Sequence, residues 1–146
     1  VLATLGSKVT LIERSPVIWA LLDDAVRRGL DDPSVGSFLK DNYLLHHDDS
    51  KSFLESSGNS YDTIYLDPMY PHMKKSAMNK HKMRILRKLV GDDEDSAELF
   101  ATAVKYADKR VVVKRPKGAP LLDERKPSYS VTGKSSRYDI YLIPYL

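Results

Sequence analysis

Apolar and polar positions alternate along this chain with two different periods. Short runs of β-branched or aromatic residues predict strands. Longer stretches, in which apolar residues recur every three to four positions, predict amphipathic helices. Strands are expected at residues 8–13, 43–46, 61–66, 109–114, 129–132 and 137–143, and helices at 16–29, 35–40, 50–56, 76–90 and from 96 onward. This order predicts an α/β fold with a mostly parallel sheet and an antiparallel pair of strands at its C-terminal edge.

Several residues are expected to begin or end these elements. Ser15 ahead of Pro16 predicts a helix N-cap, and Gly29 predicts the end of the same helix. Ser96 predicts a second N-cap. The uninterrupted apolar run Val111–Val113 predicts a strand that is covered on both faces.

The composition is that of an ordinary globular domain, with 42% hydrophobic and 29% charged residues among 146. That length predicts one domain over residues 1–146. No run approaches the roughly 18 apolar residues that a transmembrane helix needs, and Val1–Leu5 lacks the charged region that opens a signal peptide. The absence of cysteine excludes disulfides, thiolate metal sites and a cysteine nucleophile. These features fit a cytoplasmic protein without a membrane partner.

Charge is distributed unevenly, although the net charge is only +3. Residues 68–91 contain no acidic side chain. The basic side chains of this window are Lys74, Lys75, Lys80, Lys82, Arg84, Arg87 and Lys88. This basic block begins just after the turn at residues 67–71, a candidate active-site turn. It would bring phosphates close to that turn, which is the interpretation we favour. The alternative is a solvated helix face, the usual role of a charged run.

Acidic residues follow three of the predicted strands, and ligands of parallel α/β sheets bind beyond the carboxyl ends of strands. Glu13, with Arg14 beside it, could bind ribose hydroxyls, or it could cap the helix that starts at Pro16. Asp49 and Ser50 could bond an adenine edge, or Ser50 could cap the next helix.

The third acid opens the run Asp67-Pro68-Met69-Tyr70-Pro71, directly after a predicted buried strand. Two prolines fix the backbone and remove donors, which leaves the carbonyls near Pro68 free to accept hydrogen bonds. One carboxylate and one carbonyl suit an exocyclic amine, and Tyr70 could stack on the base. A proline-rich turn is the plain alternative, but the strand before Asp67 and the acids upstream favour a nucleobase site.

Other chemistry finds little support. The chain has no Gly-x-Gly-x-x-Gly and no Walker-type loop, and it has no nucleophile-elbow serine. His46 and His47 are adjacent on a predicted strand and would point to opposite faces, so we expect no shared metal ion.

The same residues resemble a known family. Asp67 to Pro71 resembles the Asp/Asn-Pro-Pro-Tyr/Phe motif of S-adenosylmethionine (SAM)-dependent amino-methyltransferases. More widely, the chain resembles the bacterial small-subunit ribosomal RNA guanine-N2 methyltransferase J family. This resemblance rests on Leu11–Pro16, Ala20–Asp24, Tyr65–His72, Val111–Pro116 and Arg137–Tyr141.

The resemblance implies a Rossmann-like methyltransferase fold, SAM as cofactor and methyl transfer to the N2 amine of a guanine in 16S rRNA. It implies that Glu13 and Arg14 lie on the ribose side, Asp49 and Ser50 near the adenine, and Asp67 near both the methyl donor of the cofactor and the target amine. Pro68 and Tyr70 complete the predicted catalytic set. The predicted RNA contacts are Lys74, Lys75, Lys80, Lys82, Arg84, Arg87, Lys114 and Arg115.

Members of that family carry a central strand and a glycine-rich loop ahead of the matching segment. By resemblance, we expect both to be missing from this chain, which then represents an N-terminally truncated methyltransferase. Three alternative functions stay open: methylation of adenine N6 or another base amine, nicotinamide-dependent dehydrogenation, and RNA binding by a catalytically dead fragment.

Overall fold

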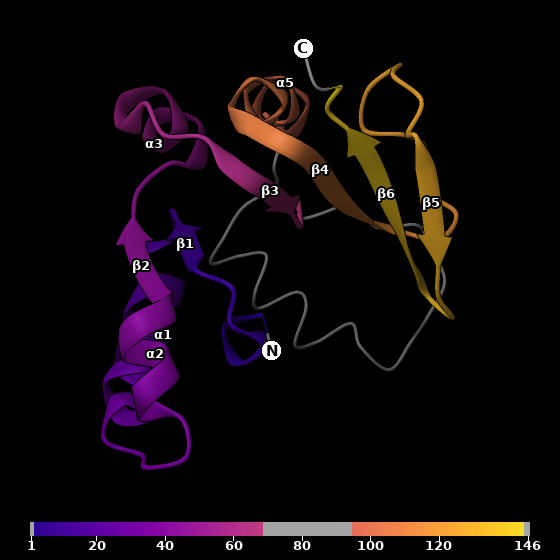
Figure 1. Cartoon of the computed structure of the whole chain (residues 1–146). Helices are drawn as coiled ribbons and strands as arrows, with labels where there is room; N and C mark the ends of the chain where they lie inside the picture. The colour runs from indigo at the N-terminus through magenta and orange to yellow at the C-terminus, as the bar shows by residue number, and fades with distance from the viewer. Residues whose placement is uncertain (1, 69–94, 145–146) are drawn as a thin grey trace. The chain divides into compact units, whose positions relative to one another are not determined.

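A computed structural model describes residues 2–68 and 95–144 of the chain (Figure 1). By the density of contacts, the chain divides into two compact units, Val1–Phe53 and Leu54–Leu146. A single domain over residues 1–146 remains a prediction. No helix in the described ranges is both long and apolar enough to span a bilayer.

The first unit is built on one pair of parallel strands. Its elements are η1 (Ala3–Leu5), β1 (Val9–Glu13), α1 (Pro16–Leu30), α2 (Gly36–Asn42), β2 (Tyr43–His47) and the first turn of α3 (Ser50–Ser57). Pairing between β1 and β2 runs from Val9 opposite Tyr43 to Glu13 opposite His47. The carboxyl ends of the two strands therefore lie at one edge, as predicted for an α/β fold.

Local signals explain most of α1. Ser15 is buried and its Oγ accepts a hydrogen bond from the Ile18 amide at 3.5 Å, which confirms the predicted N-cap. The predicted stop at Gly29 is wrong, because α1 continues to Leu30. A Cβ at Gly29 would lie 2.6 Å from Cδ1 of Leu39. Gly29 therefore lets α1 approach α2 closely.

The second unit contains a four-stranded mixed sheet in the order β3-β4-β6-β5 (Figure 1). Its elements are β3 (Tyr61–Leu66), α5 (Ser96–Tyr106), β4 (Ala107–Pro116), β5 (Tyr129–Thr132) and β6 (Ser136–Leu142). β3 is parallel to β4, while β6 runs antiparallel to both β4 and β5. The antiparallel pair with β5 at the edge is therefore confirmed. The predicted helix over 76–90 lies outside the described residues.

The core of this unit lies between α5 and one face of the sheet. Phe100 on α5 and Val111 and Val113 on β4 have no exposed surface, and the Phe100 and Tyr141 rings lie 4.6 Å apart. Val112 points to the opposite face and is only half-buried. In the described part of the unit, the run 111–113 therefore alternates in burial, and the expected cover on both faces is not observed.

The start of α5 differs from the prediction. Ser96 is the first helical residue, and Asp95 occupies the cap position without a side-chain capping bond to the helix. Leu99 and Val104 pack against the buried cluster as partly buried side chains. Phe100 is more deeply buried than either.

Candidate functional site

In the first unit, the candidate site lies at the carboxyl ends of β1 and β2. Glu13 ends β1 opposite His47, and the Asp48 amide donates to the Glu13 carbonyl at 3.3 Å. The two parallel strands thus bring the segments that hold Glu13 and Asp49 to one edge. The predicted arrangement, in which acidic residues lie at the carboxyl ends of neighbouring parallel strands, is therefore present in this unit.

Glu13 uses its side chain locally. Its Oε1 accepts a hydrogen bond of 2.7 Å from the Ser15 amide, at the turn into α1. Glu13 thus binds the amide of the N-cap residue, while Ser15 itself caps α1. This bond does not exclude ribose binding, because an ionised carboxylate has about four acceptor positions. The bond holds the half-buried carboxylate in one orientation at the strand end.

Asp49, rather than Ser50, caps α3. Its Oδ1 accepts a hydrogen bond of 2.9 Å from the Ser52 amide, and Ser50 is the first helical residue. The bond from the Ser52 amide is the main cause that lowers the pKa of Asp49, and the positive charge of Arg14 lowers it further. Arg14 and Asp49, two predicted cofactor residues, are therefore electrostatically coupled at this edge.

Aromatic rings lie beside the same strand end, which sequence reasoning missed. Trp19 of α1 stacks on His47 with ring centres 5.1 Å apart, and Phe53 of α3 lies 4.8 Å from His46. Adjacent histidines thus meet different rings. Among the residues that the structure describes, no cluster of three or more His, Cys, Asp or Glu side chains could hold a metal ion.

In the second unit, the candidate site lies at the carboxyl ends of β3 and β4. Leu66 pairs with Val113, so Asp67 comes opposite Lys114 one residue further along. Lys114 Nζ contacts Asp67 Oδ2 at 2.8 Å. Both residues were predicted to be functional, but as parts of different groups. The signal was present in the sequence, because each is the first charged residue after an apolar run that forms a strand.

Two tyrosines lie close to this ion pair. Tyr138 is opposite Lys114 in the β4–β6 register, and Tyr65 lies two residues before Asp67 on the same face of the sheet. Burial raises the pKa of Tyr65, the Asp67 charge raises it further, and Lys114 opposes that effect. The hydrogen bond to Asp67 raises the pKa of Lys114.

The turn after Asp67 is described only as far as Pro68, which is half-buried. The remaining predicted residues of this region lie outside the described ranges. They are Tyr70 and the basic residues Lys74, Lys75, Lys80, Lys82, Arg84 and Arg87.

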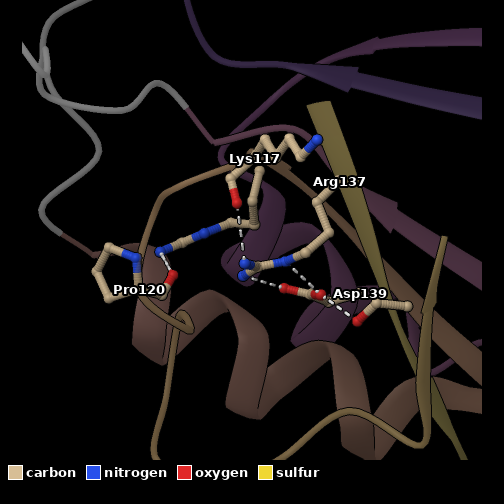
Figure 2. Close-up of polar contacts among 6 residues, drawn as sticks. Lys117, Pro120, Arg137 and Asp139 are labelled. Carbon is tan, nitrogen blue, oxygen red and sulfur yellow. Dashed lines mark hydrogen bonds and ion pairs between the residues drawn. The ribbon is translucent and has the colours of Figure 1, made fainter. Parts of the chain in front are cut away.

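The structure does not support a phosphate contact for Arg115. Its side chain is 1% exposed, because it points from β4 to the same face as Val113. The Nη2 group donates to the Pro120 carbonyl at 2.5 Å (Figure 2). Burial, and next the charge of Arg137, lower the pKa of Arg115 to about 10, while Asp139 opposes them. Arg115 therefore remains charged at neutral pH and acts in the structure of the sheet and the following loop.

Asp139 is the counter-charge of this cluster. Arg137 forms two hydrogen bonds to its carboxylate, each 2.8 Å, and Ser130 Oγ donates at 2.6 Å (Figure 2). Arg137 Nη1 also reaches the Lys117 carbonyl at 3.4 Å. The Arg137–Tyr141 segment, part of the resemblance, thus ties β5, β6 and the loop after β4 together.

Comparisons with known proteins agree with this architecture. The chain is 56% identical over its whole length to a ribosomal RNA small subunit methyltransferase J of Desulfotalea psychrophila, and it covers 56% of that protein. Over 97% of the chain it is 47% identical to the protein of the same name in Actinobacillus pleuropneumoniae serotype 5b, of which it covers 57%. The chain thus spans little more than half the length of these relatives.

A solved structure shows the same fold. The crystal structure of a SAM-dependent methyltransferase from Neisseria gonorrhoeae matches with a TM-score of 0.76 at 36% identity, over 97% of this chain and 55% of that one. The family model described as "Putative SAM-dependent methyltransferase" matches residues 1–143. The predicted α/β methyltransferase fold and the resemblance to the methyltransferase J proteins are confirmed, and the chain belongs to this family of SAM-dependent methyltransferases.

Proposed function

We propose that the protein transfers a methyl group from SAM to the exocyclic N2 amine of a guanine in 16S rRNA. The observation that carries this proposal is the acidic residue Asp67, placed at the end of a parallel strand and followed by Pro68, in a chain similar to methyltransferase J proteins. The reaction would take place in the cytoplasm, on the rRNA or the small ribosomal subunit.

The cofactor side is assigned to the strand ends of the first unit. The residues fit a nucleoside, because Glu13 offers a held carboxylate to ribose hydroxyls and Asp49 offers an acceptor to an adenine amine. Arg14 keeps a positive charge beside Asp49, and Ser50 adds a hydroxyl at the first turn of α3. SAM bound there would supply the methyl group.

The acceptor side is assigned to the strand end of the second unit. Asp67 would accept one N–H of the target amine, and the carbonyl near Pro68 would accept the other. The amine loses one proton when its nitrogen takes the methyl group, and the Asp67 carboxylate is the acceptor assigned to that proton. Tyr70 would stack on the base, and the basic residues between 74 and 87 would contact RNA phosphates.

The first test is calorimetric titration of the 146-residue chain with SAM, with NAD as the control ligand. SAM is expected to bind, and NAD is not. Glu13→Ala should weaken SAM binding by about 10-fold or more, because a charge-assisted hydrogen bond is lost. Asp67→Ala should weaken it too if the acid faces the methyl donor. Asp62→Ala is the matched control, since Asp62 is an exposed acid on the same strand. Binding of NAD instead would contradict the proposal.

The second test identifies the product. Small ribosomal subunits that lack this methyl group are incubated with SAM and the chain, and the nucleosides are then separated by mass. N2-methylguanosine is the expected product. Formation of N6-methyladenosine would show that the acceptor is an adenine amine and that the reaction is still methyl transfer from SAM. Salt-sensitive RNA binding with no SAM affinity would favour an RNA-binding fragment.

A further inference from the structure

The strands β3 and β4 are joined by two ion pairs at opposite ends. Lys109 contacts Asp62 near the amino end of the pair of strands, and Lys114 contacts Asp67 at the carboxyl end. Both pairs are exposed, since Lys114 and Asp67 retain 36% and 50% of their side-chain surface. Exposed pairs contribute about 0–1 kcal/mol to stability, so neither pair is needed for folding.

The two pairs differ in their surroundings. The Lys114–Asp67 pair shares one face of the sheet with Tyr65 and Tyr138, and both tyrosines are electrostatically coupled to Lys114. It also occupies the edge at which parallel α/β sheets bind ligands. The Lys109–Asp62 pair lies at the opposite edge. The same chemical pair therefore occurs once at the candidate site and once away from it.

We propose that Lys114 is a positioning residue: its ammonium group binds Oδ2 of Asp67 and turns Oδ1 toward the amine of the target base. This inference rests on the proposed function. It replaces the role of Lys114 as a phosphate contact, because Nζ is 2.8 Å from a carboxylate that is assigned to the reaction.

The physical reason is the freedom of an aspartate side chain. An exposed carboxylate without a partner samples several rotamers, and only some of them direct an oxygen at the amine. A lysine on the neighbouring strand selects one of these orientations while it leaves the second oxygen available. Correct orientation of a reacting group changes the rate constant far more than it changes binding of the substrate.

The test compares Lys114→Met with Lys109→Met, which removes the matched cation at the other end of the same strands. Steady-state kinetics are measured with small ribosomal subunits that lack the methyl group, at several salt concentrations. Lys114→Met is expected to lower kcat by about 3- to 5-fold, the limit set by a contact of up to about 1 kcal/mol, with KM for the subunit and its salt dependence unchanged. Lys109→Met should match the wild type. Lys114→Arg, which keeps a cationic donor, should recover most of kcat.

Other outcomes overturn the inference. Unchanged kcat with a raised KM and a weaker salt dependence would make Lys114 a phosphate contact. An equal loss in Lys109→Met would show a general effect of the strand pair. If the wild-type chain neither binds SAM nor methylates the subunit, the proposed function is contradicted, and the inference falls with it. Normal wild-type activity with a normal Lys114→Met variant overturns the inference alone.

Discussion

Three aspartates of this chain have similar sequence contexts but different physical roles. Asp67 is exposed and paired with Lys114, Asp49 caps a helix, and Asp139 is 1% exposed and accepts two hydrogen bonds from Arg137. Each follows or lies within a strand. Their environments decide which of them could take part in chemistry and which of them hold the fold.

At the residue scale, Asp139→Asn is expected to lower the free energy of unfolding by about 2–4 kcal/mol. The amide cannot compensate the charges of Arg115 and Arg137, and breaking a buried pair from one side leaves an uncompensated charge. Urea denaturation of both proteins measures the difference. Asp62→Asn is the control, because its pair with Lys109 is exposed and should contribute at most about 1 kcal/mol. Equal losses in the two variants would contradict a special role for the buried cluster.

The same variant makes the contribution of Asp139 visible as a function of pH. Burial alone would raise the pKa of Asp139, but the hydrogen bonds from Arg137 and Ser130 lower it below the usual value of 3.8. A carboxylate whose pKa is lower in the folded state than in the unfolded state stabilises the folded protein at pH values above the unfolded-state pKa. This stabilisation is lost as the pH falls through the folded-state pKa. The difference in stability between wild type and Asp139→Asn should therefore be constant near neutral pH and shrink below about pH 4.

At the scale of elements, caps and close approaches explain details that periodicity does not. Ser15 was recognised as a cap because proline follows it, whereas Asp49 was not chosen over its neighbour Ser50. Asp49 and Ser50 are neighbouring polar residues at the start of a helix, and a one-residue shift in that start changes which of the two caps it. Glycine behaves similarly: Gly29 suggests a helix end in the sequence, but it allows two helices to pack.

Gly29 and Gly36 form a matched pair for a prediction on the packing of α1 and α2. An added Cβ at Gly36 would collide with the Leu30 carbonyl oxygen and lie 3.1 Å from its carbon. At Gly29 its one close contact would be with the end of the flexible Leu39 side chain, while Val35 Cγ2 would lie at an ordinary contact distance of 3.7 Å. Gly36→Ala should therefore destabilise by about 1–3 kcal/mol, since backbone cannot move aside easily.

Gly29→Ala should have a much smaller effect. Rotation of Leu39 relieves the contact, and alanine is favoured over glycine by about 1 kcal/mol inside a helix. Thermal or urea unfolding of the two variants decides the comparison. A larger loss for Gly29→Ala than for Gly36→Ala would show that Leu39 has no room to rotate.

At the scale of the whole molecule, the described residues bury their core unevenly. The fully buried side chains Phe100, Val111 and Val113 all belong to the second unit, whereas every residue of β1 is only half-buried. A two-stranded pair is marginally stable by itself, while β4 is hydrogen-bonded on both sides by β3 and β6.

Hydrogen exchange should reflect this difference. Backbone amides of β4 and β6 are expected to exchange more slowly than those of β1 and β2, because opening them disrupts the buried core. Exchange followed by mass spectrometry resolves the four segments. Addition of SAM should slow exchange at the ends of β1 and β2 if the proposed cofactor site is correct. Equal protection of β1 and β4 in the free chain would contradict the expected order.

In the part of the chain that the structure describes, the sequence alone determined the type and order of the strands and α-helices and the three acids that follow strands, and it also indicated the family. Periodicity, proline and apolar runs act within a few residues, so they can be read locally. Tertiary structure decided the rest. Asp67 and Lys114 are 47 positions apart, and only the register of β3 on β4 brings them together. The contact of the buried Arg115 likewise depends on the loop that holds Pro120, which no local pattern specifies.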